Sequence, residues 1–319
     1  MIRLGIAGLA HMHARSYISA IQALSEECVL SGVWDDEPAR LETYSRELAT
    51  FDHLDALLAA SDAIIVCTEN ARHKEVTLRA LSAGKPVLCE KPLATTLEDA
   101  QEMVRASEQA GVLLHTAFPV RFASSVRRAK EAIQEGEIGS VLSVSGTNHG
   151  TIPGGWFTNA ELSGGGAVMD HTVHLADLLR FMLGAEIQSV YAEVSGGYGS
   201  GTDDAALLTL ELANGVAATI DASWSRPRGF PTWGDLTMRI VGTRGEIEVD
   251  AFAPQAVLSG ETHRWIGARE DMDAELIRDF LRAVRGEKSE GANGKDGLAA
   301  LKVALAAYNS AQAGDITHL

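Results

Sequence analysis

The first 118 residues alternate short apolar runs with segments of helical period, and this alternation restricts the fold more than any other feature. The runs are continuous and rich in Val, Ile and Leu, as strands buried on both faces must be. They are RLGIAG (3–8), CVLSGVWD (28–35), DAIIVCT (62–68), PVLCE (86–90) and VLLHTAF (112–118). Strands that alternate with helices in this way predict an α/β domain with a doubly wound parallel sheet and right-handed crossovers.

Beyond residue 120 the period changes. The helical segments SSVRRAKEAIQEG and GGGAVMDHTVHLADLLRFMLG come first, followed by period-two strands with tight turns, ALLTLEL–ANG–VAATIDASW and DLTMRIV–GTRG–EIEVDA. Their alternating side chains indicate a sheet with one covered face and one wetter face. We therefore predict a Rossmann domain at 1–119 and, at 120–319, an α+β domain with an open, mostly antiparallel sheet. Two helices close the chain, and the C-terminal one is free to pack back on the first domain.

Charge and cysteine usage exclude several classes of partner. The chain has 27 Lys and Arg against 43 Asp and Glu, a formal charge of −16, and so acidic a surface repels phosphate backbones. No apolar run approaches the ~20 residues that a membrane span needs. Cys28, Cys67 and Cys89 are too few and too scattered for a disulfide framework. We therefore expect a cytoplasmic protein without a signal peptide that binds neither nucleic acid nor a membrane.

The turn after the first apolar run carries part of a dinucleotide-binding pattern. In that pattern a first glycine permits a tight turn, a second small residue lets the backbone approach a pyrophosphate, and the next helix offers free N–H groups. Here Gly8 stands first, Ala10 second and His13 third, with His11 between them. These residues fit a phosphate-binding turn, although an ordinary strand-to-helix turn with an exposed histidine has the same pattern.

Two carboxylates follow at the end of the second apolar run. Asp35 comes 27 residues after Gly8 and is followed by Asp36, near the ~20-residue offset at which an acidic side chain accepts hydrogen bonds from an adenosine ribose. The alternative is a solvated turn before Pro38, where acidic pairs are common. Together with the Gly8 turn, the pair favours a dinucleotide site. Because like charges there would repel the 2′-phosphate of NADP, NAD is the expected cofactor.

Four segments together resemble the Gfo/Idh/MocA oxidoreductase family, which includes glucose–fructose oxidoreductase and inositol dehydrogenase. They are SDAIIVCTENARHKEVTLRAL, AGKPVLCEKPLATTLEDA, VRFASSVRRAKEAIQEGEIGSVLSV and GGGAVMDHTVHLADLLRFMLG. They follow one another in family order, and the combination of EKP after a strand with a later GGGxxxDxxxH is specific. The resemblance implies an NAD-dependent enzyme that oxidises a secondary hydroxyl of a sugar, inositol or related polyol.

The same resemblance implies roles for individual residues. Glu90, Lys91 and Pro92 would line the nicotinamide end of a cleft, with Lys91 reaching both cofactor and substrate. Asp170 and His174 would face it from the second domain, with His174 as the proton acceptor.

A second stretch matches the part of the family that passes beneath the cofactor. Thr68, Asn70 and His73 stand at the matching positions, so the resemblance makes them cofactor-binding residues. Glu69 stands where many relatives have proline, which would alter that loop.

Spacing gives an independent argument about the histidines. Asp170 and His174 are four positions apart, so a helix places them on one face where they can touch the same small molecule. His171 would point elsewhere, roughly 100° around that helix. A metal needs three or four converging ligands, and Asp170, His171 and His174 do not converge; His11 and His13 also diverge if helical. No metal is therefore expected, and a histidine satisfied in the core is the alternative for His174.

Two other classes of function remain open on the sequence. One is an NAD-dependent glycosidase of the same family, and the other is a non-catalytic regulator that senses sugar and NAD. Lys91, Asp170 and His174 together favour an enzyme over the regulator.

The open sheet of the second domain predicts a homodimer or homotetramer, because a large half-apolar face is rarely left bare.

Overall fold

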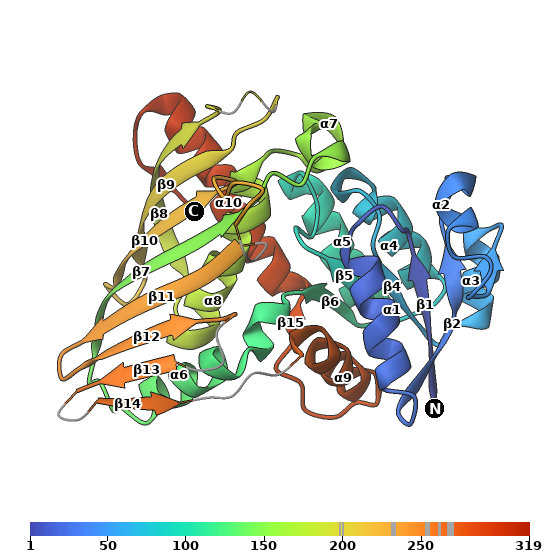
Figure 1. The fold of residues 1–319 in the computed structure, drawn as a ribbon, viewed down its shortest axis with the longest axis horizontal. Coiled ribbons are helices and arrows are strands. Elements are labelled where there is room, and N and C mark those ends of the chain that lie inside the picture. The colour runs from blue at the N-terminus through green and yellow to red at the C-terminus, as the bar shows by residue number, and fades with distance from the viewer. Residues whose placement is uncertain (198, 200, 231–233, 253–255, 261–262, 267–270) are drawn as a thin grey trace. The chain divides into compact units, whose positions relative to one another are not determined.

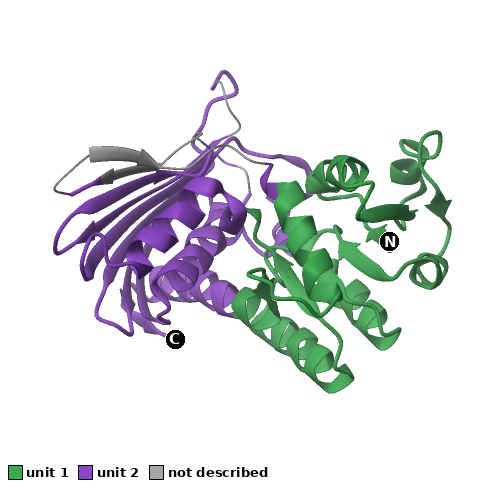
Figure 2. Ribbon diagram, turned by 90° about the horizontal axis from the view of Figure 1, so that it is seen from below, with its two compact units in different colours: residues 1–119, 273–298 green, residues 120–272, 299–319 purple. Residues whose placement is uncertain are grey.

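The computed structural model describes residues 1–197, 199, 201–230, 234–252, 256–260, 263–266 and 271–319. These residues form two compact units, one of residues 1–119 and 273–298 and the other of residues 120–272 and 299–319 (Figure 2). Within this described part of the chain, no helix is both long and apolar enough to cross a membrane.

The first unit is built on a seven-stranded sheet of order β15-β6-β5-β4-β1-β2-β3. All of its pairs are parallel except β15 with β6. The strands are β1 (Ile2–Ala7), β2 (Cys28–Trp34), β3 (Thr50–Phe51), β4 (Ala63–Val66), β5 (Val87–Glu90), β6 (Leu114–Ala117) and β15 (Ala292–Asn293). β4 and β5 are buried over their whole length, which is why all of their residues except Glu90 are apolar. The predicted doubly wound parallel sheet is confirmed.

Helices connect these strands (Figure 1). They are α1 (His13–Ala23), α2 (Pro38–Glu42), α3 (Leu54–Ala60), α4 (His73–Ser82), α5 (Leu97–Ala110) and α9 (Met272–Val284), with a short 3₁₀ helix at Asn70–Arg72. α3 contacts β1 and β2, whereas α4 contacts β4 and β5. α5 begins where the Thr96 hydroxyl accepts a hydrogen bond from the Asp99 N–H at 3.2 Å, and it ends at Gly111 in the left-handed conformation.

The segment 273–298 belongs to the first unit, so the predicted division into 1–119 and 120–319 is incomplete. β15 pairs with the edge strand β6, and the Phe280 ring of α9 lies 5.9 Å from the His115 ring of β6. The last helix, α10 (Gly294–Ala313), counts with the second unit from residue 299 onward. The period of a sequence reveals an apolar stripe on a helix, but it does not say which sheet that stripe covers.

The second unit is built on a nine-stranded sheet of order β14-β13-β12-β11-β7-β10-β9-β8-β16. Only β10 with β7 is parallel among its described pairs, so the predicted mostly antiparallel sheet is confirmed. The strands are β7 (Val141–Gly150), β8 (Ile187–Ser195), β9 (Ala205–Leu212), β10 (Ala217–Ser223), β11 (Gly234–Gly242), β12 (Glu246–Asp250), β13 (Ala256–Ser259), β14 (His263–Ile266) and β16 (Thr317–His318).

Helices of the second unit pack on one face of this sheet (Figure 2). They are α6 (Ser124–Gln134), α8 (Val173–Leu183) and most of α10. The chain also forms a short helix α7 (Ala160–Ser163), which contacts the 3₁₀ helix Gly155–Thr158, and a further 3₁₀ helix at Pro119–Phe122. A π-helical turn, Val168–Thr172, leads directly into α8. Along β9 the burial alternates, with Leu208 and Leu210 buried and Leu207 and Thr209 exposed. The alternation reflects one covered face and one wetter face.

Candidate active site

The turn after β1 brings the chain against the segment that follows β4. Gly8 has φ +93°, and a Cβ there would lie 2.5 Å from the backbone nitrogen of Thr68, so only glycine fits this close approach. The Gly8 N–H donates to the Trp34 carbonyl at 2.7 Å. The turn is therefore fixed to its neighbours, although two of the three glycines of the dinucleotide pattern are replaced.

Asp35 ties this turn to the end of β2. Its side chain is buried, and its carboxylate accepts hydrogen bonds from the Leu9 N–H at 2.6 Å and the Glu37 N–H at 2.8 Å. Burial raises the pKa of Asp35 and outweighs the effect of these donors. Asp36 is exposed instead and accepts a hydrogen bond from Arg72 at 2.6 Å. Of the predicted acidic pair, Asp35 is the residue that contacts the turn.

Arg40, on α2, is surrounded by carboxylates. Its guanidinium lies 2.6 Å from Glu69 Oε1, 3.4 Å from Asp35 Oδ1 and 3.2 Å from Glu37 Oε2. Burial lowers the pKa of Arg40, but the hydrogen bond to Glu69 and the nearby negative charges outweigh it and raise that pKa. The partnership with Arg40 was not foreseen for Glu69, because a side chain on one loop gives no local sign of its partner on another.

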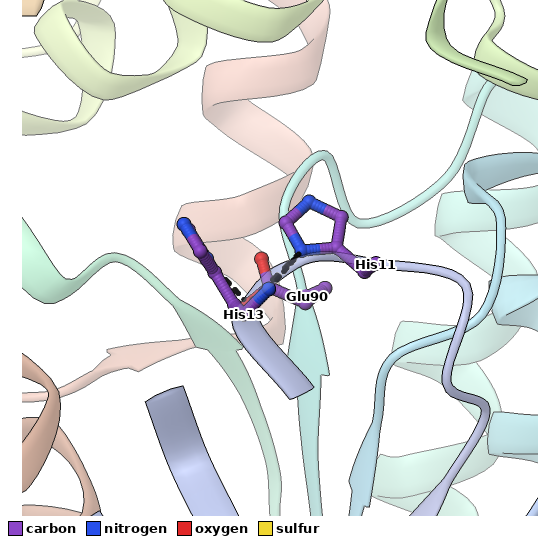
Figure 3. A group of neighbouring side chains, drawn as sticks. All are labelled: His11, His13 and Glu90. Atoms are coloured by element: carbon purple, nitrogen blue, oxygen red, sulfur yellow. Dashed lines mark hydrogen bonds and ion pairs between the residues drawn. The ribbon is translucent and has the colours of Figure 1, made fainter. Parts of the chain in front are cut away.

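His11, His13 and Glu90 lie together at the same edge of the sheet (Figure 3). The Nδ1 atoms of His13 and His11 lie 2.9 Å and 3.9 Å from Glu90 Oε1, and the two imidazole centroids are 4.6 Å apart. His11 precedes α1 and His13 begins it, so the divergence expected for two helical residues does not arise. The Tyr17 hydroxyl also donates to Glu90 Oε1, at 2.5 Å.

Charges in this cluster stabilise one another. Burial alone would raise the pKa of Glu90, but His11 and His13 outweigh it and lower that pKa. Burial likewise opposes the charge on His13, yet the charge of Glu90 and the hydrogen bond to it raise the His13 pKa. Sequence reasoning missed Tyr17, although its position four residues after His13 places both on one face of α1.

Lys91 and Pro92 follow β5 in a turn that is held from two sides. The Lys91 N–H donates to Glu90 Oε2 at 3.1 Å. His73 is fully buried, with Nδ1 2.9 Å from the Pro92 carbonyl oxygen; since a carbonyl only accepts, Nδ1 carries the proton. Burial lowers the pKa of His73, which keeps the ring neutral. His73 therefore supports the Lys91 turn rather than offering a surface to a ligand.

The remaining predicted cofactor residues lie at the same edge. Thr68 and Asn70 follow β4 and are buried, and Asn70 begins the 3₁₀ helix before α4. Ala10 lies between β1 and α1, next to His11. Because the carboxyl ends of parallel strands share one edge of a sheet, the structure brings together the three segments that the sequence singled out in this unit.

In the second unit, Asp170 contacts one partner that is far away in sequence and one that is its neighbour in the chain. The Trp224 indole N–H donates to Asp170 Oδ2 at 3.0 Å, and His171 Nε2 lies 3.3 Å from the same oxygen. The prediction that His171 points away from Asp170 is wrong. Both residues lie in a π-helical turn, so the angle of roughly 100° that holds in an α-helix does not apply to them, and their side chains meet.

The two histidines of this segment differ in environment. His171 is buried, and its Nδ1 lies 2.8 Å from the Asn148 carbonyl oxygen. His174, in the first turn of α8, is partly exposed. Of the two histidines, His174 is the more exposed, and His171 is part of the core.

The glycines before the π-helical turn fit against two residues that sequence reasoning missed. A Cβ on Gly166 would lie 1.8 Å from the Asp203 carbonyl oxygen, and one on Gly165 would lie 2.1 Å from the Tyr308 hydroxyl. The Gly166 N–H donates to Asp203 Oδ1 at 2.8 Å, and Tyr308 donates to that oxygen at 2.7 Å. Close packing inside this unit thus requires these glycines and places the residues that lead to Asp170.

Two family descriptions match the chain. "Oxidoreductase family, NAD-binding Rossmann fold" matches residues 2–118, and "GFO/IDH/MocA C-terminal domain" matches residues 126–248. The chain belongs to the Gfo/Idh/MocA family. As a member of this family it is an oxidoreductase with an NAD-binding Rossmann domain, as its sequence resemblance implied.

Relatives within the Gfo/Idh/MocA family include enzymes of known name. The chain is 32% identical to the 1,5-anhydro-D-fructose reductase of Ensifer adhaerens, over 81% of this chain and 80% of that protein. It is 27% identical to the scyllo-inositol 2-dehydrogenase (NAD(+)) of Bacillus subtilis, over 98% of this chain and 93% of that protein. The WlbA dehydrogenase of Bordetella pertussis, solved with NADH and UDP-GlcNAcA, shares the fold with TM-score 0.87 at 24% identity, over 100% and 97% of the two chains.

Proposed function

We propose that this member of the Gfo/Idh/MocA family moves hydride between the nicotinamide of NAD and a secondary hydroxyl of a sugar, inositol or related polyol. The observation that carries the proposal is the carboxyl edge of the first sheet. There the Gly8 turn contacts Thr68, and the Lys91 turn is held by His73 and Glu90. This is the edge at which a Rossmann sheet binds its dinucleotide. Relatives that act on inositols and on an anhydro sugar support the class of substrate.

The residues of the first unit fit a dinucleotide. A side chain at Gly8 would collide with Thr68, so the chain keeps a small turn ahead of α1, and the first N–H groups of a helix suit a pyrophosphate. Asp35, just after β2, would accept a hydrogen bond from a ribose hydroxyl. NAD, when bound, supplies the nicotinamide carbon that accepts or returns the hydride.

The preference for NAD over NADP follows from the charges around β2. Asp35 and Asp36 oppose a 2′-phosphate, as the sequence suggested. Arg40 would attract that phosphate, but Glu69, Asp35 and Glu37 already neutralise it. Glu69 thus acts as a specificity residue by holding Arg40.

Three side chains would carry the chemistry. His174 would take the hydroxyl proton, because histidine is the side chain whose ordinary pKa lies near neutrality and because it is partly exposed. Lys91 would stabilise the negative charge that develops on a substrate oxygen. Asp170, oriented by Trp224, would accept a hydrogen bond from a substrate hydroxyl.

The test is NADH formation across a panel of aldoses, inositols and sugar acids. The proposal expects reduction of NAD with at least one secondary alcohol and no metal requirement for turnover. Absence of NADH with every member, in a protein that binds NAD by calorimetry, would overturn it. Release of an aglycone from aryl glycosides without net NADH would identify the NAD-dependent glycosidase instead.

The open face of the second sheet supports the proposal of a homodimer or homotetramer. Leu207 on β9 is 62% exposed and Tyr191 on the neighbouring β8 is 37% exposed, and exposed apolar side chains on one sheet face suit association with a second copy. Light scattering should give a particle mass that is a multiple of the chain mass, and Leu207→Glu should lower that particle mass.

The three cysteines are buried thiols, which suits the cytoplasm that we propose as the location of the protein.

A further inference from the structure

Three side chains at the edge of the first sheet converge as metal ligands do. One ligand atom from each of His11, His13 and Glu90 lies within 4.8 Å of the other two. The histidine nitrogens are 3.9 Å and 2.9 Å from the carboxylate oxygen (Figure 3). Two ligands of a tetrahedral zinc ion with bonds of ~2.0–2.2 Å lie about 3.3 Å apart. The observed separations lie on both sides of that value, so small side-chain movements produce the coordination distance.

We propose that His11, His13 and Glu90 bind a divalent transition-metal ion of the zinc type, and that this ion competes with the dinucleotide. Two imidazole nitrogens with one carboxylate oxygen suit zinc or cobalt, whereas magnesium and calcium take oxygen ligands. On binding, the metal takes the place of the hydrogen bond between His13 Nδ1 and Glu90 Oε1 and of the hydrogen bond of 3.2 Å from the His13 N–H to His11 Nδ1.

The surroundings of Glu90 resemble the second layer of a metal site. The Tyr17 hydroxyl donates to Oε1 at 2.5 Å and the Lys91 N–H to Oε2 at 3.1 Å, so the carboxylate is oriented before any ion arrives. His11 and Glu90 are buried, whereas the His13 side chain is 28% exposed and leaves a route for the ion. Three protein ligands leave a fourth position open to water or another small ligand.

The location of these ligands explains the competition. His13 replaces the third glycine of the dinucleotide pattern, and His11 lies in the same turn, while Glu90 precedes Lys91. An ion bound to these three side chains holds the turn between β1 and α1 in one conformation. The ion and the ligand in its fourth position also occupy the place where the proposed function puts the cofactor. The competition rests on that proposed function, but the metal binding does not.

Metal binding is tested with untagged, metal-free protein. Titration with Zn²⁺ should give one site by calorimetry, and Co²⁺ should give the visible absorption of a site with nitrogen and oxygen ligands. Loss of a ligand in His13→Ala should weaken Zn²⁺ at least 100-fold, and Tyr17→Phe should weaken it about tenfold, as loss of an outer partner does. His53→Ala, an exposed histidine of the same unit, is the matched control and should bind as wild type does.

Two results overturn the metal site: no stoichiometric Zn²⁺ binding, or binding that His13→Ala and Glu90→Gln leave unchanged. The competition is tested by titrating NAD at several Zn²⁺ concentrations. Its apparent Kd should rise with free Zn²⁺ in wild type and stay constant in His13→Ala. Unchanged NAD affinity in zinc-loaded wild type overturns the competition. Zinc binding in a protein that binds no NAD at all contradicts the proposed function and leaves the metal site in place.

Discussion

The two units position their functional side chains by different means. In the first, Gly8, Thr68 and Lys91 each lie within two residues of the end of a parallel strand, so the sheet itself brings them to one edge. In the second, Asp170 depends on Trp224 and on a π-helical turn. A site at strand ends is encoded in short stretches of sequence, whereas a site held by distant partners is encoded in pairs of residues that have no common pattern.

The largest effect should come from the residues to which the proposal assigns chemistry. His174→Ala should lower turnover by ~10²–10⁴, the usual range for loss of a general base, and Lys91→Ala by ~10²–10³, the range for loss of a group that stabilises developing charge, while calorimetry still detects NAD binding in both. His171→Ala should instead lower the melting temperature of the protein, because the His171 ring is buried. A stable, fully active His174→Ala, or an active Lys91→Ala, contradicts the assignment.

Two ion pairs allow the same comparison for stability. Asp177 on α8 accepts hydrogen bonds from the buried Arg121 at 2.5 and 2.7 Å. Asp177→Asn should lower the free energy of unfolding by ~3–5 kcal/mol, since it leaves a buried charge without its partner. In the first unit the Arg3–Asp62 pair is exposed, so Asp62→Asn should cost no more than ~1 kcal/mol. If urea denaturation gave the same loss in free energy of unfolding for Asp177→Asn and Asp62→Asn, burial would not explain how much each ion pair contributes to stability.

A smaller effect concerns cofactor choice at the end of β2. Glu69→Ala frees Arg40 from its shortest ion pair, and a released guanidinium can bind a 2′-phosphate. The NADP affinity should rise about tenfold, the value of one hydrogen bond between charged groups, with little change for NAD. Glu75→Ala, an exposed glutamate on α4, is the control. NADP binding that stays unchanged in Glu69→Ala would remove Glu69 from the account of specificity.

The smallest expected effect is a pH dependence in the second unit. The hydrogen bond that His149 donates to Asp235 raises the pKa of His149, and the negative charge of Asp221 adds to this effect although Arg226 lies close by. Because the folded pKa is higher than the unfolded one, the stabilisation is complete below the ordinary value of ~6.5 and is lost as pH rises through the folded pKa. The melting temperature of wild type should therefore fall relative to that of His149→Gln as pH rises. Parallel curves for the two proteins would contradict the ion network.

Much of the fold could be predicted from sequence because its signals are local. Continuous apolar runs identified the Rossmann strands, and period-two alternation identified the second sheet. The membership of 273–298 in the first unit could not be predicted, since the stripe on α9 fits either sheet. Strand pairing between residues distant in sequence has no local signature.

The candidate site divides in the same way. The Gly8 turn and the Lys91 turn were located from short patterns, but the ion pair of Glu69 with Arg40 was not. The contact between Asp170 and His171 could not be predicted from their spacing, because both residues lie in a π-helical turn and not in an α-helix. Such turns arise from packing against other segments, which the spacing of residues does not reveal.

The transfer of hydride itself is the most direct test of the proposed function. Wild-type protein is incubated with NAD and a polyol that carries deuterium on every carbon, with ring-deuterated myo-inositol and fully deuterated D-glucose as the first candidates, and the reduced nicotinamide is analysed by mass spectrometry. The proposal predicts one deuterium per nicotinamide, because the hydride comes from the carbinol carbon. Reduced cofactor without deuterium, or no reduced cofactor with any deuterated polyol or sugar, would contradict it.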